Sequence, residues 1–313
     1  MNLQQLRYVS EVARRGLNVS EAAEALHTSQ PGVSKQIRAL EEELGTALFV
    51  RQGKRFTALT DAGREIVNAI DRILAEIANL RAVGEEFAHH AKGALAIGVT
   101  HTQARYALPP IVTAFKKRFP EVHLKLLQGN PHQLARMVLA GEADVAIATE
   151  ALDGYPELVT VPGYQWHHCI VVPKGHPLAR VKPLTLEAIA QHPIVTYDPT
   201  FAGRASIDRT FGARHLAPDI VLTALDSDVI KSYVALGLGV GIISERAYRK
   251  GYDTELTALP ASHLFPTQTT RLAFRRGAYL RNFTVEFIRL FAPHLRGEDL
   301  KHLAAAAGES FEI

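Results

Sequence analysis

The chain has 313 residues, a formal net charge of +3 and a single cysteine. This length permits several domains with separate apolar cores, and the mild positive charge permits a polyanionic partner without requiring one. One cysteine excludes an internal disulfide and a zinc site built on paired thiols. Cys169 stands in the apolar run CIVV, which favours a buried small residue over a nucleophile.

The sequence shows no signal for secretion or membrane insertion. The N-terminus MNLQQLRYVSEVARR lacks the charged and then apolar pattern of a secretory signal. No stretch offers the roughly 18 consecutive apolar residues that a membrane span needs. We therefore expect a protein that works in the cytoplasm.

Residues 1–60 have the pattern of short helices followed by a hairpin. The first helix is marked by apolar residues at helical spacing, which are Leu3, Leu6, Val9 and Val12. Asn18 or Ser20 can cap a second helix, and Glu21 can answer Asn18 as in a capping box. Ser29 can cap a third helix that has Pro31 in its first turn, where a missing amide hydrogen costs little.

The third predicted helix has an apolar face and a polar face. The apolar stripe consists of Val33, Ile37, Leu40 and Leu44, and Gly45 ends the helix. The opposite face carries residue types that can reach base edges and phosphates, namely Gln30, Ser34, Lys35 and Arg38. LFVRQGKRFTAL then predicts a hairpin with Arg51, Lys54 and Arg55 at its tip. The predicted DNA contacts of this winged helix-turn-helix are Ser29, Gln30, Pro31, Ser34, Lys35, Arg38, Arg51, Lys54 and Arg55.

A solvated charged face is the alternative explanation for these basic residues. The three glutamates at residues 41–43 are expected at the far end of the third helix, away from Lys35, Arg38 and the hairpin. Because phosphates attract cations and repel carboxylates, this separation of charge favours DNA binding.

Residues 61–91 are predicted to form one long linker helix that begins after Thr60, with Asp61 in its first turn. Its apolar residues follow steps of four and three, at Ile66, Ile70, Ile73, Ile77, Leu80 and Phe87. A seam of this period is typical of a helix that pairs with another helix. We therefore expect a dimer that presents two DNA-binding heads.

From about residue 92 the pattern changes to alternating strands and helices, which favours an α/β architecture. The predicted strands are ALAIGV, HLKLLQ, DVAIAT, HCIVVP, PIVTY, DIVLTA, GVGIIS and RLAFR. The predicted helices include IVTAFKKRF, HQLARMVLAG and DSDVIKSYVALGL. The length of this region indicates two lobes.

The segment GVTHTQARY, residues 98–106, lies where the first of these strands ends and a helix begins. Ligands bind at such sheet edges, and a helix N-terminus offers free amide donors to an anion. Thr100, Thr102 and Gln103 can surround a small oxyanion there, and Thr149 ends a second strand. His101 has no neighbouring nucleophile in a recognisable motif, so binding is favoured over catalysis.

Two further patterns have structural explanations. The run Gly237-Leu238-Gly239-Val240-Gly241 lacks the spacing of a dinucleotide-binding motif and favours close backbone packing. The pairs His89-His90 and His167-His168 lack a convergent carboxylate, and neighbouring residues of a strand point to opposite faces. We predict no metal site, no cofactor and no catalytic residue.

The chain resembles the LysR-type transcriptional regulators. In the first sixty or so residues the resemblance is carried by AAEAL (22–26), SQPGVS (29–34), IRALE (37–41), LG (44–45), LFVR (48–51) and LTDAG (59–63). Downstream it is carried by stretches such as THTQARYALP, DVAIATEAL and DVIKSYVALGLGVGII. The resemblance implies a winged helix-turn-helix (1–60), a linker and dimerisation helix (61–91), and a two-lobed effector domain (92–300) like the periplasmic solute-binding proteins.

The resemblance also implies where the lobes and the effector lie. Lobe I would comprise about residues 92–162 and 268–295, and lobe II about residues 163–267. The effector-binding positions would be Thr100, Thr102, Gln103, Thr149, Trp166 and Ala202. Ala202 stands where similar sequences often carry a threonine that meets the effector. One missing neutral hydrogen bond weakens binding by about 1 kcal/mol unless water replaces it, so the effector can differ.

Within the family, the chain is most similar to regulators of cysteine biosynthesis. This implies a regulator of sulfur assimilation genes that binds double-stranded promoter DNA, forms dimers or tetramers, contacts RNA polymerase and responds to acetylserine, sulfate or a related anion. The alternative within the family is a regulator of sulfonate or sulfate-ester utilisation. The alternative outside it is a solute-binding or catalytic α/β protein, which the basic N-terminal surface and the lack of a signal peptide disfavour.

Overall fold

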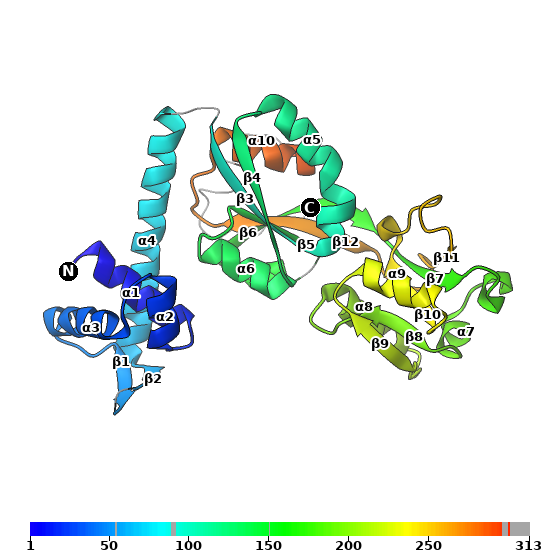
Figure 1. The fold of residues 1–313 in the computed structure, drawn as a ribbon, viewed down its shortest axis with the longest axis horizontal. Coiled ribbons are helices and arrows are strands. Elements are labelled where there is room, and N and C mark those ends of the chain that lie inside the picture. The colour runs from blue at the N-terminus through cyan, green and yellow to red at the C-terminus, as the bar shows by residue number, and fades with distance from the viewer. Residues whose placement is uncertain (54, 89–91, 150, 296–299, 301–313) are drawn as a thin grey trace. The chain divides into compact units, whose positions relative to one another are not determined.

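A computed structural model describes the chain except for residues 54, 89–91, 150, 296–299 and 301–313. Contacts divide the chain into two compact units, Met1–Gly84 and Glu85–Ile313. Figure 1 shows the helices and strands of both units in chain order from blue to red. Among the helices in the described ranges, none has the length and apolar character needed to cross a membrane.

The first unit contains three short helices, a two-stranded antiparallel hairpin and most of a long helix (Figure 1). In chain order these are α1 (Leu3–Arg14), α2 (Val19–Ala25), α3 (Gln30–Leu44), β1 (Phe49–Gln52), β2 (Arg55–Leu59) and α4 (Asp61–Ala88). This arrangement is the winged helix-turn-helix and long helix that the sequence predicts.

The predicted caps begin and end these helices. Asn18 and Ser29 accept hydrogen bonds from backbone N–H groups in the first turns of α2 and α3. The Thr60 hydroxyl caps α4 in the same way. Gly45 ends α3 at a φ of 68°, a left-handed conformation that glycine adopts without steric cost.

The apolar core of the first unit lies between α1, α2, α3 and the beginning of α4. The predicted stripe residues Val33, Ile37 and Leu40 are fully buried in it. Leu44, the fourth predicted member, is 40% exposed. The prediction is wrong there because Leu44 lies in the last turn of α3, and helical period alone does not show where the facing helices stop.

Glu41 departs from the predicted separation of charge. Its buried carboxylate accepts the backbone N–H groups of Leu48 at 2.8 Å and Phe49 at 3.3 Å. It also pairs with Arg51 of β1 at 2.5 Å. The glutamate therefore does not lie away from the hairpin but fixes it to the end of α3, because the first N–H groups of the hairpin need an acceptor.

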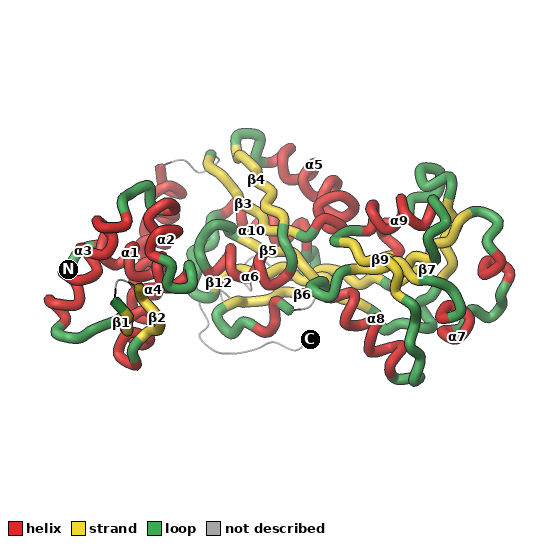
Figure 2. The backbone as a smooth tube through the Cα atoms, turned by 60° about the horizontal axis from the view of Figure 1, so that its bottom comes forward, coloured by secondary structure: helices red, strands yellow, loops and turns green. Residues whose placement is uncertain are grey.

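The second unit is built on two five-stranded sheets. The first has the order β4-β3-β5-β12-β6 and consists of β3 (Gly93–Val99), β4 (Val122–Gln128), β5 (Val145–Thr149), β6 (Leu158–Trp166) and β12 (Gln268–Arg275). Helices α5 (Leu108–Arg118) and α10 (Asn282–Phe291) pack on one face, and α6 (Pro131–Leu139) covers the other (Figures 1 and 2). We call this part lobe I.

The second sheet has the order β11-β7-β10-β8-β9. Its strands are β7 (His168–Pro173), β8 (Ile194–Tyr197), β9 (Ile220–Ala224), β10 (Val240–Ser244) and β11 (Leu256–Pro260), and its helices are α7 (Leu186–Ala190), α8 (Ala202–Gly212) and α9 (Ser227–Ala235). We call this part lobe II. Short helical turns lie at η1 (Gln103–Ala107), η2 (Leu152–Gly154), η3 (Pro177–Arg180) and η4 (Glu245–Ala247).

The apolar core of lobe II confirms two predictions. A Cβ atom at Gly239 would lie 2.3 Å from the backbone oxygen of Pro193, and one at Gly241 would lie 2.5 Å from Val171. These glycines therefore serve close packing, as the sequence indicates. Cys169 is buried, and burial raises the pKa of its thiol to about 12, which removes it as a nucleophile at neutral pH.

The chain crosses between the lobes on two adjacent antiparallel strands. β6 pairs with β12 from Leu158↔Arg275 to Trp166↔Gln268. This ladder keeps the chain in lobe I as far as Trp166, so the first crossing lies just before His168 and not near residue 163. The return crossing lies just before Gln268.

Two strands have no counterpart in the sequence prediction, β6 and β11. Pro162 and Gly163 interrupt the first, and Pro260 ends the second. Both strands lie at sheet edges, where proline is tolerated because one side of the strand needs no ladder hydrogen bonds. The sequence analysis did not predict these two strands because proline and glycine are typical of turns. Pairing with neighbouring strands stabilises both.

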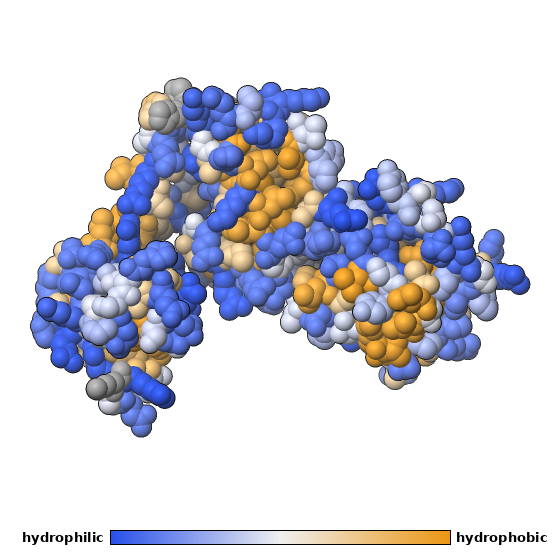
Figure 3. All heavy atoms as spheres, in the orientation of Figure 1, coloured by the Kyte–Doolittle hydropathy of each residue, from blue (hydrophilic) through white to orange (hydrophobic). Residues whose placement is uncertain are grey.

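Lobe II exposes apolar side chains along β9 and α9. They are Val221, Leu225, Val229, Tyr233 and Leu236. Figure 3 shows an apolar patch over the region of β9, which is an edge strand. An exposed apolar patch beside an unpaired strand edge is typical of a protein interface.

Replacing Glu41 by alanine should loosen the start of the hairpin, because the buried N–H groups of Leu48 and Phe49 lose their acceptor. An unsatisfied buried donor costs about 1–3 kcal/mol, so amide exchange at these residues should become about tenfold faster or more. Hydrogen-exchange mass spectrometry measures this. Glu42→Ala is the matched control, since its side chain is exposed; equal exchange in both variants would contradict the role of Glu41.

Candidate functional site

The exposed face of α3 collects four of the predicted DNA-contacting residues. Lys35 and Arg38 are exposed, and Gln30 Nε2 lies 3.4 Å from Ser34 Oγ one turn apart. Residues three and four apart share a helix face, so cations, an amide and a hydroxyl stand together opposite the buried stripe. This combination can contact both phosphates and base edges.

The other predicted DNA-contacting residues lie at the start of α3 and in the hairpin. The Ser29 hydroxyl caps α3, and Pro31 is exposed in its first turn. Arg55 is exposed at the start of β2, whereas Lys54 lies outside the described residues. Arg51 is held in the ion pair with the buried glutamate and lies over an aromatic ring of β2 at 4.8 Å. Its guanidinium therefore supports the hairpin, although the residue as a whole remains exposed.

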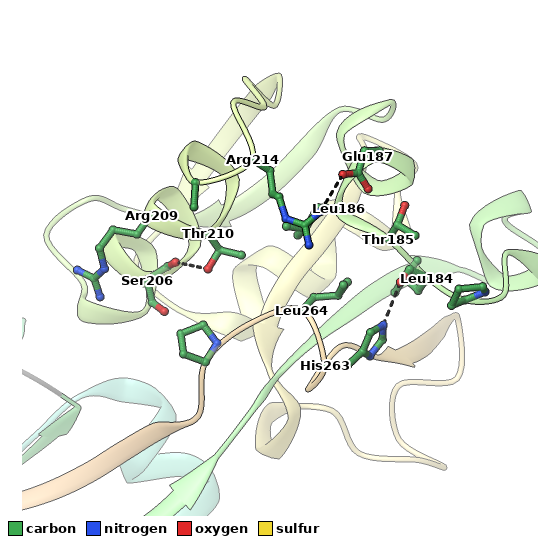
Figure 4. Close-up of a pocket in the computed structure, with 13 residues that line it drawn as sticks. Leu184, Thr185, Leu186, Glu187, Ser206, Arg209, Thr210, Arg214, His263 and Leu264 are labelled. Atoms are coloured by element: carbon green, nitrogen blue, oxygen red, sulfur yellow. Dashed lines mark hydrogen bonds and ion pairs between the residues drawn. The ribbon is translucent and has the colours of Figure 1, made fainter.

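The second unit has two cavities of interest. The larger, about 580 Å³, lies inside lobe II and is lined from α7, α8 and the segment before β12 (Figure 4). Arg214 Nη1 lies 3.7 Å from Glu187 Oε1, and His263 Nε2 lies 2.9 Å from the Leu184 backbone oxygen. Dashed lines mark both interactions in Figure 4. The predicted effector residues whose side chains are described line the smaller cavity, which we call the cleft. They are Thr100, Thr102, Gln103, Thr149 and Trp166.

The cleft measures about 50 Å³ and lies where the two lobes meet. Its other lining residues are His101, Pro131, Tyr197, Phe201, Gly203, Leu225 and Ser244. Ala202 begins α8 between two of these residues. None of the described lining residues is Lys, Arg, Asp or Glu. The volume suits a few water molecules or one small oxyanion.

Thr270 of β12 joins the predicted residues through its buried hydroxyl. Gln103 Nε2 and Trp166 Nε1 donate to this oxygen at 3.3 and 3.1 Å. Thr149 Oγ1 lies 3.2 Å from the Thr270 hydroxyl and 3.3 Å from Trp166 Nε1, so the indole N–H is shared between the two threonines. The two hydroxyls, the amide and the indole therefore form one buried network at the cleft.

Further hydrogen bonds fix the cleft from both lobes. The Tyr164 hydroxyl donates to Gln103 Oε1 and so fixes the orientation of that amide. In lobe II, Tyr197 Oη lies 2.8 Å from Ser227 Oγ and accepts the Ser244 N–H at 2.9 Å. Burial raises the pKa of both tyrosines, so they stay neutral at physiological pH.

Helix α8 begins at the cleft. Its N-cap residue, Phe201, provides no side-chain hydrogen bond to the free N–H groups of the first turn. Those groups and the helix dipole favour a negative charge at this end. Neutral donors around a helix start suit a small anion or polar molecule, and the described lining contains no nucleophile with a paired base. The described part of the lining therefore suits binding better than catalysis.

The histidines at the first crossing point in opposite directions. His167 Nε2 lies 3.1 Å from Thr267 Oγ1. His168 is buried between the rings of Trp166 and Phe265, and burial lowers the pKa of its imidazole to about 4. Its ring nitrogens have no hydrogen-bond partner among the described residues. The two rings therefore do not converge on one point, and the other pair, at residues 89–90, lies outside the described residues.

Asp228, in the first turn of α9, lies beside the cleft among cations. Asp228 Oδ2 lies 3.0 Å from both His101 Nε2 and Arg105 Nε, and Oδ1 lies 3.3 Å from Lys231 Nζ. With Asp226, His101 and Asp228 place possible metal-ligand atoms within 4.8 Å of one another. Arg105 and Lys231 already neutralise Asp228, so the cluster is better described as a charge network than as a metal site.

Two family descriptions match the chain. Residues 3–64 match "Bacterial regulatory helix-turn-helix protein, lysR family", and residues 88–296 match "LysR substrate binding domain". The chain belongs to the LysR family. LysR regulators bind promoter DNA and small-molecule effectors and form oligomers, so the protein is a transcriptional regulator and not an enzyme.

Individual LysR proteins are similar over nearly the whole chain. The HTH-type transcriptional regulator SsuR of Burkholderia cenocepacia is 52% identical over 98% of this chain and 100% of its own. CysB of the same species is 50% identical over 100% of both chains. The crystal structure of the cofactor-binding domain of the Cbl transcriptional regulator aligns with a TM-score of 0.66 and 46% identity, over 68% of this chain and 93% of that one.

Some residues of the cleft belong to no sequence motif, and the sequence did not predict them. Thr270, Tyr197 and Ser244 come from three separate strands and meet the predicted residues only in the folded chain. One feature of the sequence could have indicated that Thr270 has a polar partner. It alternates with Leu272 on the inward face of β12, and a hydroxyl on an otherwise apolar strand face needs a polar partner.

Thr270→Val should disturb the cleft from within, because valine keeps the size of the side chain but removes the hydroxyl that pairs three polar groups. We expect the free energy of unfolding to fall by about 1–3 kcal/mol. Trp166 is the only tryptophan of the chain, so all tryptophan fluorescence arises beside this hydrogen-bond network and should shift.

Thr269→Val is the matched control for this experiment, since residue 269 points to the opposite face of β12. An unchanged emission maximum and thermal midpoint in the Thr270 variant would show that the hydroxyl does not organise the cleft.

Proposed function

We propose that α3 and the hairpin form the surface that contacts promoter DNA. The support is the exposed pair Lys35 and Arg38 beside Gln30 and Ser34, on the face of α3 that the core leaves free. Cations supply affinity for phosphates, whereas amides and hydroxyls distinguish bases. The proposed surface also includes Ser29, Pro31, Arg51, Lys54 and Arg55.

We propose that the cleft holds the effector and that this ligand is sulfate, acetylserine or a related small anion. The observation that supports this proposal is that neutral donors line the cleft at the start of α8. None of the described lining residues is Lys, Arg, Asp or Glu. Such donors hold an anion without a counter-ion, as backbone N–H groups do at other helix starts. The proposed contacts are Thr100, Thr102, Gln103, Thr149, Trp166 and the backbone at Ala202.

We propose that the target genes serve sulfur assimilation and cysteine biosynthesis. The support is the identity of about half the residues to CysB over the full length of both chains. Regulation of sulfonate or sulfate-ester utilisation is the second candidate, favoured by the similar identity to SsuR. The two candidates share one ligand chemistry, a small sulfur-status anion in the cleft.

We propose that the protein acts as a dimer or tetramer and contacts RNA polymerase at its promoters. On α4, Ile70 packs into the core of the first unit, while Ile73 and Leu80 of the predicted seam are 42% and 73% exposed. The apolar side chains of β9 and α9 offer a second surface for self-association. An effector then acts by its differential affinity for two arrangements of the assembly.

Arg38→Ala should weaken binding to a promoter fragment and reduce the slope of log affinity against log salt by about 1, because one phosphate contact is lost. Gel-shift titrations at several salt concentrations measure both quantities. Arg72→Ala on α4 is the control, an exposed arginine outside the α3 face. Thermal stabilisation by the effector should persist, and its loss would contradict the separation of DNA and effector sites.

Thr102→Val should abolish the effector response while the protein still retards DNA, because the cleft loses a hydroxyl donor. Thermal shifts with acetylserines, sulfate, thiosulfate and sulfonates identify the ligand and measure the loss. Thr113→Val, exposed on α5, is the control. Unchanged ligand affinity in the Thr102 variant would remove this residue from the site.

A further inference from the structure

The segment that carries two of the proposed effector contacts contains a π-helical turn. Residues Gln103–Ala107 have this conformation, closed by the hydrogen bond from the Leu108 N–H to the Gln103 oxygen five residues earlier. The regular helix α5 continues directly from it. Single π-turns within helices often occur at functional sites, because they change which side chains share a face.

The turn changes which side chains can reach lobe II. In a regular α-helix, residues five apart point about 140° away from each other. An i to i+5 hydrogen bond instead brings such residues above one another, so His101 and Tyr106 share a face with Arg105. All three reach Asp228, with Tyr106 Oη at 2.5 Å from Oδ1 and the other two at 3.0 Å from Oδ2.

Asp228 is held rigidly within lobe II. It lies in the first turn of α9, whose dipole favours a negative charge. Burial opposes ionisation, but hydrogen bonds from Tyr106 and His101 and the charge of Lys231 lower the pKa of Asp228 on balance. Lys231 is buried and also binds Asp253 at 2.8 Å and the Ala247 backbone oxygen at 2.8 Å.

The residue next to Asp228 touches the cleft itself. Ser227 Oγ lies 3.4 Å from Thr102 Oγ1 of lobe I and 2.8 Å from Tyr197 Oη of lobe II. The first turn of α9 therefore contacts lobe I at two places: Ser227 lies beside Thr102, which directly precedes the π-turn, and Asp228 contacts Arg105 and Tyr106 within it. A movement of one lobe against the other must break or remake both contacts.

We propose that Asp228 is a positioning residue for the cleft: its carboxylate in lobe II fixes the π-turn of lobe I, so that Thr102 and Gln103 face the ligand. This inference rests on the proposed effector function of the cleft. Asp228 does not line the cleft itself, so it acts through the turn that it holds. Ligand binding and closure of the lobes on each other are coupled through this contact.

The first test needs no ligand. Hydrogen-exchange mass spectrometry of the full chain compares the wild type with Asp228→Asn, Tyr106→Phe and the double variant. The amides of residues 101–108 should exchange about tenfold faster in each single variant, because a charge-assisted hydrogen bond is lost. The effect of the double variant should be clearly smaller than the sum of the two single effects, since both changes remove the hydrogen bond between Tyr106 and Asp228.

Asp219→Asn is the matched control, the same substitution at an exposed carboxylate of lobe II. Wild-type exchange in the Asp228 and Tyr106 variants would overturn the proposal. So would effects that simply add in the double variant, because the two side chains would then act independently. Tyr106→Phe removes only one oxygen atom, so this variant should fold and allow the comparison even if Asp228→Asn does not fold.

The second test measures function by titrating sulfate and N-acetylserine into the same proteins by calorimetry. Each single variant should lose about tenfold in affinity, and the double variant should lose clearly less than the roughly hundredfold that independent effects would give. Faster exchange with unchanged affinity would overturn the positioning role and leave only a structural contact. If the wild type binds neither ligand, the proposed effector chemistry fails instead, and the exchange experiment still decides whether Asp228 holds the turn.

Discussion

The antiparallel pairing of β6 with β12 is the constraint on which the second unit depends, because the chain enters and leaves lobe II through these two strands. Their ladder ends at Trp166↔Gln268, which places the indole and the Thr270 hydroxyl where the lobes meet. Just beyond the ladder, His167 contacts Thr267 across the two crossings. The same pairing therefore joins the lobes and builds one wall of the cleft.

Charge is distributed differently in the two units, and this separates their functions. The first unit exposes Lys35 and Arg38 on a helix face, where phosphates are attracted through solvent. The cleft in the second unit is lined by neutral donors, while the charged groups around Asp228 neutralise one another beside it. In the proposed site, a ligand would be held mainly by oriented dipoles, which need no proton transfer. A binding protein needs this arrangement, and an enzyme would need a reactive group within it.

Helix ends and strand ends could be predicted from the sequence, because they depend on residues that are close together in the chain. Asn18, Ser29 and Gly45 mark the helix ends because caps involve only the nearest turn of backbone. Thr100, Thr102, Gln103 and Thr149 could be placed at strand ends for the same reason, since the ends of neighbouring parallel strands meet at one sheet edge. Glu41 could not be placed this way, because its acceptor role depends on where the hairpin returns to α3.

By itself, the amino-acid sequence determined the winged helix-turn-helix, the α/β effector domain, the LysR family and most of the cleft, because hydrophobic period, caps and motifs act over short stretches of chain. Only the tertiary structure decided that Thr270 organises the cleft, that β6 is a strand despite its proline, and that a π-turn brings His101, Arg105 and Tyr106 onto Asp228. These features join residues more than a hundred positions apart or depend on pairing at a sheet edge. Their energies come from contacts that exist only once the lobes have formed, so no local pattern records them.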